Sequence, residues 1–375
     1  PDIGGPATYA CEIRKRLHER GHQVKIVTWS ERAEAAHDVY VIPRGLNMKF
    51  IGGFLRYFRL LMTILRTSQN SDVIYTQNPT YIGLVSLLAA KLLRKPVVLR
   101  FPGDKAWEKS FDGGKTRKSM EDFLSSPEGG VYIRFLLCLQ RFILRRVRKI
   151  IVPSNFMQEV LTKYYRVDPR KVVVIYHSVA LEDYQSSAAD ELPRFGQPTI
   201  ITAGRLVQHK RIDQIIKVVA ELAVEYPDIM LLIVGDGPLR ENLERLSTAL
   251  GVAGRVKFLG NVAHHEVATL IKSADIFVLN SISEGFPHVL VEAMACRKVV
   301  VATNIRGTDE VVDDEATGIL VSPNDNEELG CQITRLLKDE DLRKRFAENA
   351  YRKVQQRFTW ENNLDLLQKE LEGII

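Results

Sequence analysis

The sequence predicts an α/β protein with two doubly wound domains, each built around a parallel sheet. Short apolar, β-branched segments alternate with amphipathic helical segments along almost the whole chain, which is typical of parallel sheets. The chain has 375 residues, and this length favours two domains. The alternation stops once, in a polar stretch over 182–197, and then restarts. We therefore expect an N-terminal domain over 1–180 and a C-terminal domain over 181–356, with a last helix within 357–375 that joins the first domain.

Each domain has its own series of predicted strands. In the first domain, an amphipathic helix over 9–20 precedes a strand at 24–28. The other strands of this domain are predicted at 39–42, 73–76, 96–101, 149–152 and 171–175. Those of the second domain are predicted at 199–203, 230–234, 256–258, 276–279 and 299–302. A glycine turn such as Gly4-Gly5 normally follows a strand in these domains, so we expect the first strand to be missing from the start of the chain.

The composition excludes several classes of protein. Hydrophobic residues make up 45% of the chain and charged residues 26%, so the chain can bury a core and is not disordered. Its 4 cysteines are too far apart for a metal or redox motif and too few for a disulfide framework. No apolar run reaches the ~18 residues that span a bilayer, and no signal peptide opens the chain. We expect a cytoplasmic protein, or one that lies peripherally on the inner face of the cell membrane.

Positive charge is concentrated in the first half. Residues 1–180 hold 30 Lys and Arg against 15 Asp and Glu, whereas the rest hold 22 against 31. Two acid-free stretches, 39–69 and 129–156, combine 11 cations with many large apolar residues. Helices there could lie on an anionic membrane, or they could be ordinary core helices with solvated cationic edges. Nucleic acid is not an expected partner, because no recognised binding motif accompanies the charge.

The loop after the strand at 230–234 resembles a dinucleotide fingerprint only at first glance. Gly235 and Gly237 are present, but Arg240 stands where the third glycine is required. A nicotinamide dehydrogenase is therefore disfavoured. The loop is either a tight turn before a helix or part of the lining of a nucleotide site.

The segment after the strand at 276–279 carries a more specific pattern. Gly285 lets the backbone approach a ligand, and the helix that opens at Pro287 offers free amides to an anion or a hydroxyl. Glu284 would lie at the lip of this corner. Glu292 stands in a mostly apolar helix, where its carboxylate could accept two hydrogen bonds from a ribose diol. The alternative is that these glutamates belong to ordinary helix-start chemistry.

Two cations follow the first strand of the second domain. Arg205 and Lys210 lie on a predicted strand-to-helix loop, where they could neutralise a diphosphate, with Arg205 able to bind it through two nitrogens. A solvated basic loop is the alternative.

Together these motifs resemble the donor half of the retaining GT-B glycosyltransferases of glycosyltransferase family 4. The matching segments are Gly204-Arg205-Leu206 with Lys210, Val234-Gly235-Asp236-Gly237-Pro238, Phe258-Leu259-Gly260, and Glu284-Gly285-Phe286-Pro287 with Glu292. The first half and the end of the chain agree through Gly4-Gly5-Pro6, Val152-Pro153-Ser154 and Phe358-Thr359-Trp360-Glu361. The resemblance covers the whole chain except the missing first strand.

The resemblance implies two Rossmann-like domains that face a central cleft, and a nucleotide diphosphate sugar as donor. Arg205 and Lys210 would bind the diphosphate and assist its departure, and Glu292 would bind the ribose. Glu284, with the amides of its neighbours, would bind the sugar and take part in catalysis. The other implied donor-binding residues are Gly4, Gly5, Gly235, Gly285, Phe286 and Pro287. No metal or cofactor is implied, because cationic side chains stabilise the leaving diphosphate. The acceptor would be a glycan or a lipid-linked molecule.

The sequence departs from the family pattern in the first domain. Many relatives carry a histidine in the loop after a strand, but no histidine occurs between His37 and His177. The corresponding strand at 96–101 leads to Asp104, and we predict that this carboxylate faces the cleft as a catalytic group near the anomeric carbon. The alternative is a turn residue. His177-Ser178-Val179 replaces a common Asn-Gly-Val, and no consequence is expected.

Two rival functions share parts of these features. A GT-B nucleotide-sugar epimerase would have the same architecture, but its basic first half would be unexplained. A non-enzymatic two-lobed sugar-binding protein would also close a cleft, but it would normally carry an export signal. Release of nucleotide only in the presence of an acceptor identifies a transferase.

Overall fold

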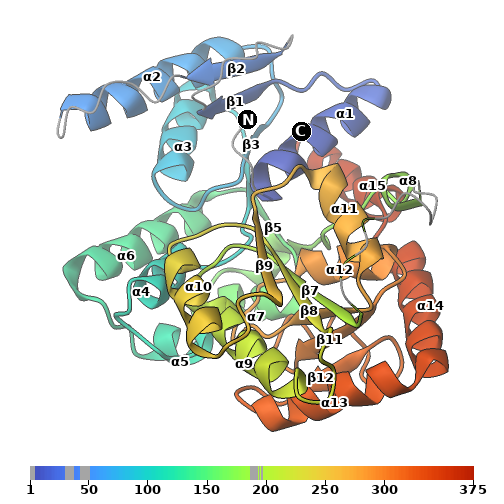
Figure 1. The fold of residues 1–375 in the computed structure, drawn as a ribbon. Coiled ribbons are helices and arrows are strands. Elements are labelled where there is room, and N and C mark those ends of the chain that lie inside the picture. The colour runs from blue at the N-terminus through green and yellow to red at the C-terminus, as the bar shows by residue number, and fades with distance from the viewer. Residues whose placement is uncertain (1–4, 30–37, 43–50, 186–192, 194, 196) are drawn as a thin grey trace.

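The structure, a computed structural model, contains three parallel sheets with helices around them (Figure 1). It describes the chain except residues 1–4, 30–37, 43–50, 186–192, 194 and 196. In the N-terminal half, β1 pairs with β2, and a second sheet has the order β3-β4-β5-β6. The C-terminal half contains one sheet with the order β12-β11-β10-β7-β8-β9. All the strand pairs of these sheets are parallel, so the predicted α/β class is confirmed.

The observed elements follow the predicted alternation closely. The N-terminal half contains α1 (Gly5–Glu19), β1 (Ile26–Trp29), β2 (Val39–Ile42), α2 (Ile51–Thr67), β3 (Ile74–Thr76), α3 (Tyr81–Leu93), β4 (Val97–Arg100), α4 (Lys105–Asp112), α5 (Met120–Ser125), α6 (Gly130–Arg146), β5 (Lys149–Val152), α7 (Asn155–Lys163), η1 (Pro169–Lys171) and β6 (Val172–Val174). The short helix α8 (Glu182–Gln185) lies at the passage to the second half.

The C-terminal half contains β7 (Thr199–Ala203), η3 (Gln208–Lys210), α9 (Ile212–Leu222), β8 (Met230–Val234), α10 (Arg240–Ala249), β9 (Val256–Gly260), α11 (His264–Ser273), β10 (Ile276–Leu279), α12 (His288–Ala295), β11 (Val299–Thr303), β12 (Ile319–Val321), α13 (Asn326–Lys338), α14 (Glu340–Arg357) and α15 (Trp360–Glu372). β12, which has three residues and lies beside β11 at the edge of the sheet, was not among the predicted strands.

The C-terminal sheet is buried on both faces. Successive side chains of a strand point to opposite sides, so each strand contributes to the core on both faces. Ile200 of β7 joins the core on one face, and Ile201 joins the core on the other. In β8, Leu231 and Leu232 alternate in the same way. The central strands β7, β10 and β11, whose only polar residues are threonines, are fully buried, whereas the edge strand β9 is partly exposed.

The last helix packs on the N-terminal half. Trp360, Leu364 and Leu367 of α15 share a buried cluster with Tyr9 and Ile13 of α1. An ion pair between Arg20 and Asp365, at 2.5 Å, adds to this contact. Figure 1 shows α15 beside α1 and far from the outer helix α13.

The chain passes between the halves at two places that lie side by side. The amide of Val179 donates to the carbonyl of Phe358 at 2.9 Å, and Val179 also forms a bridge with Thr359. The two passages are thus joined by backbone hydrogen bonds. A movement of one half against the other has to pivot at this junction.

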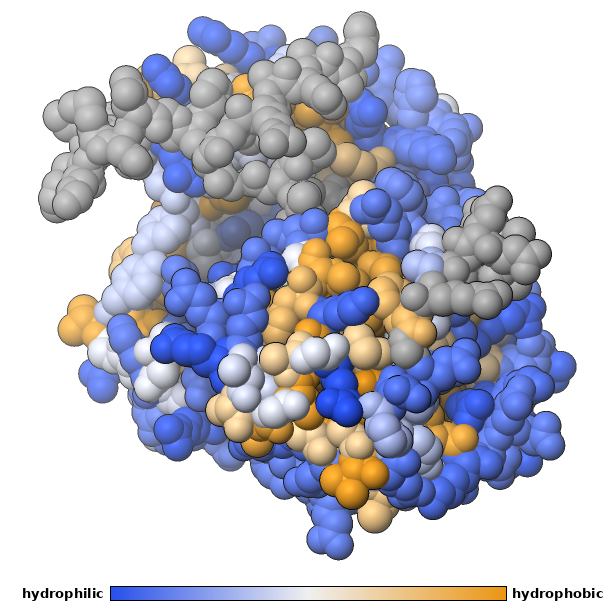
Figure 2. Space-filling view, in the orientation of Figure 1, coloured by the Kyte–Doolittle hydropathy of each residue, from blue (hydrophilic) through white to orange (hydrophobic). Residues whose placement is uncertain are grey.

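The face of the molecule drawn in Figure 2 is mostly polar, with a few hydrophobic groups. Figure 2 shows one such group over β9 and α11, and a smaller one at the outer end of α6. No helix within the described part of the chain is both long and apolar enough to cross a membrane.

Candidate functional site

Three loops meet at the carboxyl edge of the C-terminal sheet. They follow β7, β8 and β10, which are parallel neighbours, so their ends lie at the same edge. The amide of Leu206 donates to the carbonyl of Asp236 at 3.1 Å, which joins the first loop to the second. The amide of Ile282 donates to the carbonyl of His209 at 2.9 Å, which joins the first loop to the third. The motifs singled out in the sequence therefore form one connected surface.

The glycines of the β8 loop serve this contact between loops. Gly235 has a φ of 119°, and a Cβ there would lie 2.0 Å from the carbonyl oxygen of Gly204. A Cβ on Gly237 would lie 2.5 Å from the carbonyl oxygen of Leu206. Any side chain at these positions would push the two loops apart. The glycine pattern has a structural cause, and it is not a dinucleotide fingerprint.

Lys210 and Glu284 form an ion pair in the middle of this surface. The Nζ of Lys210 lies 2.5 Å from the Oε1 of Glu284, and the two side chains are 17% and 11% exposed. Burial by itself would raise the pKa of the Glu284 carboxyl, but the charge of Lys210 and its hydrogen bond hold that pKa below its usual value. The carboxylate is therefore ionised at neutral pH, and it neutralises the lysine.

Arg205 lies on the same loop as Lys210 but is exposed. Within the described residues, its guanidinium makes no ion pair or side-chain hydrogen bond. Within the part of the chain that the structure describes, Lys210 is thus neutralised by a carboxylate and Arg205 is not.

The third loop is clamped between the two halves of the protein. A Cβ on Gly285 would lie 2.6 Å from the carbonyl oxygen of Pro102, in the loop after β4. The Oγ of Ser154 donates to the carbonyl oxygen of Gly285 at 2.5 Å. Phe286 is buried against Tyr176 and Phe358, with ring centroids 5.6 Å apart in both pairs. Pro287 precedes the first residue of α12.

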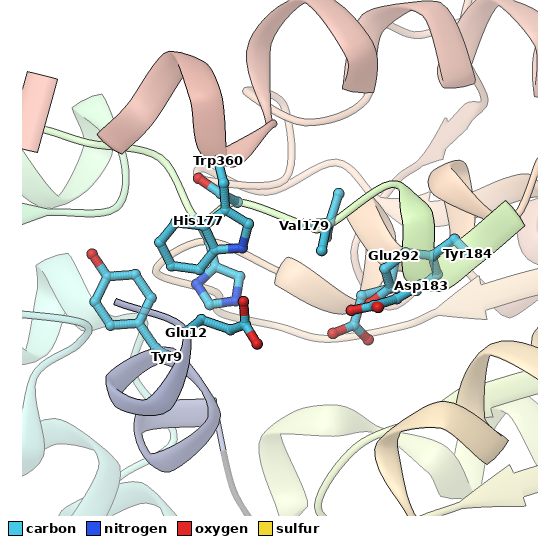
Figure 3. Close-up of a pocket in the computed structure, with 10 residues that line it drawn as sticks. Tyr9, Glu12, His177, Val179, Asp183, Tyr184, Glu292 and Trp360 are labelled. Carbon is cyan, nitrogen blue, oxygen red and sulfur yellow. The ribbon is translucent and has the colours of Figure 1, made fainter. Parts of the chain in front are cut away.

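Glu292 lies on α12 and lines a small pocket between the two halves. Figure 3 shows Glu292 with Asp183 and Tyr184 at one end of this pocket, and Tyr9, Glu12, His177 and Trp360 at the other. Burial, followed by the charge of Glu292, raises the pKa of Tyr184. Neither Lys210 nor Glu284 is among the residues that line this pocket.

The predicted position of Asp104 is wrong. Asp104 is 0% exposed and caps the start of α4, where its Oδ1 accepts from the amides of Ala106 and Trp107 at 2.9 and 2.8 Å. The Oδ2 accepts from Gln140 and from the hydroxyl of Tyr165. Burial raises the pKa of Asp104, and these hydrogen bonds oppose the rise. The turn-residue alternative describes this carboxylate, because all its hydrogen-bond partners among the described residues belong to the N-terminal half.

Gly4 and Gly5, the predicted donor-binding glycines of the N-terminal half, lie at the start of the chain. Gly4 lies outside the described residues, and Gly5 is the first residue of α1. Among the residues that the structure describes, no group of three or more His, Cys, Asp and Glu is placed to hold a metal ion.

No consequence is expected from the sequence where His177 replaces a common asparagine, yet His177 lines the same pocket as Glu292. Its ring stacks on Tyr9 with a centroid distance of 5.7 Å and lies 5.0 Å from that of His288. The departure from the family pattern was itself the available signal.

Comparison with known proteins agrees with this geometry. Residues 3–183 match the profile of Glycosyltransferase Family 4, and residues 185–353 match that of Glycosyl transferases group 1. Alpha-D-kanosaminyltransferase of Streptomyces kanamyceticus is 34% identical over 171 residues, which are 45% of this chain and 44% of that protein. The gpi3 subunit of phosphatidylinositol N-acetylglucosaminyltransferase from Schizosaccharomyces pombe is 23% identical over 100% of this chain and 78% of its own length.

The fold has close solved counterparts. The crystal structure of Anabaena Alr3699/HepE in complex with UDP and glucose superposes with a TM-score of 0.79 at 22% identity, covering 100% of this chain and 97% of that one. The fold is therefore that of the GT-B glycosyltransferases. The chain belongs to glycosyltransferase family 4, as its motifs predicted. The protein is a glycosyltransferase.

Proposed function

We propose that the protein transfers a sugar from a nucleotide diphosphate sugar to an acceptor with retention of anomeric configuration and without a metal ion. The observation that carries the proposal is the surface formed by Arg205, Lys210 and Glu284. Arg205, whose guanidinium makes no ion pair with a described residue, lies on the same loop as Lys210. Lys210 pairs at 2.5 Å with Glu284 on a second loop, which a backbone hydrogen bond joins to the first. A leaving diphosphate gains negative charge, which fixed cations stabilise without reorganisation.

The donor would extend from this surface into the pocket of Glu292. Its diphosphate would contact Arg205 and displace part of the contact between Lys210 and Glu284. Its ribose would donate to Glu292, and its sugar would lie beside Glu284 and the amides of Gly285 and Phe286. UDP in the HepE complex supports a nucleotide donor for this fold.

Substitutions at the proposed donor contacts test this assignment. We expect Glu292→Ala to weaken nucleotide binding, and Arg205→Ala and Lys210→Ala to lower kcat. Each change should cost about 1.5 to 3 kcal/mol, in the free energy of binding for Glu292→Ala and in the free energy of activation for the other two. Arg345→Ala, a change of an exposed arginine on α14, is the control. Calorimetry on a panel of nucleoside diphosphates, with nucleotide release as the activity assay, measures both effects. Wild-type binding and turnover in all three variants would refute the assignment.

The same assay separates the rival functions. A transferase releases nucleotide only when an acceptor is present. An epimerase converts one nucleotide sugar into another without acceptor, and a binding protein does neither. Analysis of the anomeric configuration of the product by NMR tests retention, and activity in the presence of a chelator tests independence of metal.

For the acceptor we propose a lipid-linked molecule at an anionic membrane surface. Among the described residues, α2, α3 and α6 expose nine large hydrophobic side chains: Leu55, Phe58, Leu84, Leu88, Leu92, Val131, Tyr132, Phe135 and Phe142. In contrast, Val224 and Leu250 are the exposed ones within the described part of 181–356. Exposed apolar groups on this scale are typical of interaction surfaces.

These helices form one continuous surface. Tyr57 of α2 lies 5.6 Å from Tyr81 of α3, and Tyr81 lies 6.3 Å from Phe135 of α6, measured between ring centroids. Leu84, Leu88 and Leu92 repeat at a spacing of four residues, so they line one face of α3. Figure 1 shows the three helices on the same side of the molecule, away from α13 and α14.

The charge of this surface selects a negatively charged partner. The sequences of α2, α3 and α6 contain no Asp or Glu. Their exposed cations among the described residues are Arg59, Arg66, Lys91, Arg134, Arg141, Arg145 and Arg146. Arg56 is half-buried, with its guanidinium 3.9 Å from the centroid of the Trp29 ring. Arg44 and Lys49 of the first basic stretch lie outside the described residues. Apolar side chains with surrounding cations fit an anionic lipid surface, with the cations at the headgroups. The name of the gpi3 relative, a phosphatidylinositol glycosyltransferase, supports a lipid acceptor.

Co-sedimentation with vesicles tests this proposal. We expect binding to vesicles of phosphatidylcholine with phosphatidylglycerol, weaker binding at high salt, and little binding to phosphatidylcholine alone. Leu88→Ser with Phe135→Ser should reduce binding. Val224→Ser, which removes an 88% exposed hydrophobic residue from the other half, should not. No binding at low salt would leave a soluble glycan as the acceptor.

A further inference from the structure

A histidine next to Lys210 joins the C-terminal half to the N-terminal half. His209 belongs to η3, and its Nδ1 lies 3.0 Å from the Oδ1 of Asp112, the last residue of α4. The two side chains are 15% and 25% exposed. The ring of His209 also packs against two buried rings of α4, with centroid distances of 5.8 Å to Trp107 and 6.3 Å to Phe111. The loop that carries Lys210 therefore contacts the N-terminal half through the side chain before it.

Asp112 does not serve its own helix. A carboxylate in the last turn of a helix is disfavoured, because the helix dipole places partial negative charge there. Within the described part of the chain, the side chain of Asp112 makes no hydrogen bond or ion pair except the one with His209. A carboxylate can only accept, so the imidazole donates to it through Nδ1. The contact with η3 thus offsets an unfavourable charge at the end of α4.

The backbone beside Lys210 is strained and needs support. Arg211 has a φ of 50°, in the left-handed region that costs a residue with a Cβ free energy. Such a conformation persists only where surrounding contacts hold it. After Lys210, the Arg211 side chain donates to Asn324 of the same half. Before Lys210, His209 donates to Asp112 of the other half. Lys210 therefore lies between two anchored residues, and one of the two anchors depends on the N-terminal half.

His209 also connects this loop to the loop of Glu284. Its carbonyl accepts from the amide of Ile282 at 2.9 Å, and the next residue, Lys210, pairs with Glu284 at 2.5 Å. Burial raises the pKa of the Glu284 carboxyl, whereas Lys210 and, more weakly, His209 lower it. His209 thus lies within electrostatic reach of the Lys210–Glu284 pair. A displacement of His209 from α4 would disturb both loops that carry this pair.

We infer that His209 and Asp112 are positioning residues for the donor, whose contact holds Lys210 in place for the diphosphate when the two halves lie together. Asp112 acts through His209, and His209 acts through Lys210. The inference rests on the proposed function, since that function assigns Lys210 to the diphosphate. It names a contact through which the N-terminal half controls the donor surface of the C-terminal half.

Comparison of a nucleoside with its diphosphate tests the contact. The probes are UDP, GDP and ADP, followed by the nucleoside of whichever binds most tightly in calorimetry. Asp112→Ala removes the acceptor, and His209→Phe keeps a ring against Trp107 but removes the donor. Each should weaken binding of the diphosphate about tenfold and leave binding of the nucleoside unchanged. Asp112→Asn keeps an oxygen for the imidazole and should retain more affinity than Asp112→Ala.

The coupling to Lys210 tests whether the contact acts by positioning. In the Lys210→Ala background, Asp112→Ala should have little further effect, because a positioning residue acts through the residue that it positions. Glu121→Ala is the matched control. Glu121 makes another ion pair between the halves, at 3.3 Å from Arg306, which keeps its partner Glu159 in this variant. Binding of both probes should be unchanged in Glu121→Ala.

Stability separates positioning from a merely structural role. Asp112→Ala should not lower the urea midpoint, because α4 loses an unfavourable charge. A lowered midpoint together with equal losses for nucleoside and diphosphate would overturn the inference. Wild-type affinity in both Asp112→Ala and His209→Phe, or a further tenfold loss when Asp112→Ala is added to Lys210→Ala, would also overturn it and leave the proposed function intact. Failure of the wild type to bind any of the three diphosphates would overturn the proposed function with it.

Discussion

The hydroxyl of Ser154 donates to the backbone carbonyl of Gly285 at 2.5 Å, and this bond joins the N-terminal half to the loop that carries Glu284. The same oxygen accepts from the amide of Met157 at 3.1 Å and so caps α7. Next to it, Glu310 of the C-terminal half accepts from the amides of Asn155 and Phe156 at 2.9 and 2.8 Å. The start of α7 is therefore held by groups from both halves. Closure of the halves and the position of the Gly285 loop depend on the same few hydrogen bonds.

Ser154→Ala should lose both a helix cap and the bond to Gly285. We expect about 1 kcal/mol lower stability and a raised KM for the donor. Ser119→Ala is a matched control, because Ser119 caps α5 by accepting from Asp122 at 3.1 Å but has no bond to the other half. Urea unfolding and steady-state kinetics measure the two effects. A donor KM that changes equally in both variants would show that the Gly285 bond is irrelevant to the site.

Glu310→Ala should loosen the contact between the halves. The carboxylate supplies two acceptors and a negative charge at the start of α7, where the helix dipole favours an anion. We expect a larger radius of gyration in small-angle scattering and lower turnover, with Glu310→Gln intermediate because it keeps one oxygen. Glu221→Ala, an exposed glutamate on α9, is the control. An unchanged scattering profile in Glu310→Ala would contradict this expectation.

The Lys210–Glu284 pair should make stability depend on pH. Its folded-state carboxyl has a pKa below the usual value, so the pair stabilises the fold above the ordinary pKa of a glutamate. This contribution is lost as the pH falls through the lowered pKa. We therefore expect Glu284→Gln to cost about 1 to 3 kcal/mol at neutral pH and progressively less in acid.

Urea unfolding over a series of pH values measures this difference. Glu327→Gln, on the exposed start of α13, should show no such trend. A cost of Glu284→Gln that stays constant into acid would mean that the charge of Glu284 does not contribute.

Asp104 should matter for folding and not for transfer. Asp104→Ala removes the cap of α4 and leaves Gln140 and Tyr165 without their acceptor, so we expect a loss of about 2 to 4 kcal/mol. Asp104→Asn keeps an oxygen for the α4 amides and should cost less. Folded Asp104→Asn should retain its kcat, measured per folded molecule. A large fall in kcat without loss of stability would restore a catalytic role for this carboxylate.

Local sequence determined the elements and the motif loops. The observed bounds of β2, β5, β7, β8 and β10 equal those predicted, because each is a mostly apolar segment that a proline, glycine or polar residue follows. The prediction failed for β12, whose three residues are too few to show a pattern. It also began α1 at residue 9, whereas the helix starts at Gly5, because glycine and proline are poor helix predictors even where tertiary packing tolerates them.

Tertiary structure alone decided which polar groups face the site. Asp104 follows a strand in the position expected of a catalytic group, but Gln140 and Tyr165, which lie 36 and 61 residues further along the chain, contact its carboxylate. His177 looked inconsequential beside its neighbours, but Arg100 meets it from a strand 77 residues away. A local pattern determines hydrogen bonds made within a few residues, whereas the direction and charge state of a side chain depend on contacts that exist only once distant strands and helices have packed together.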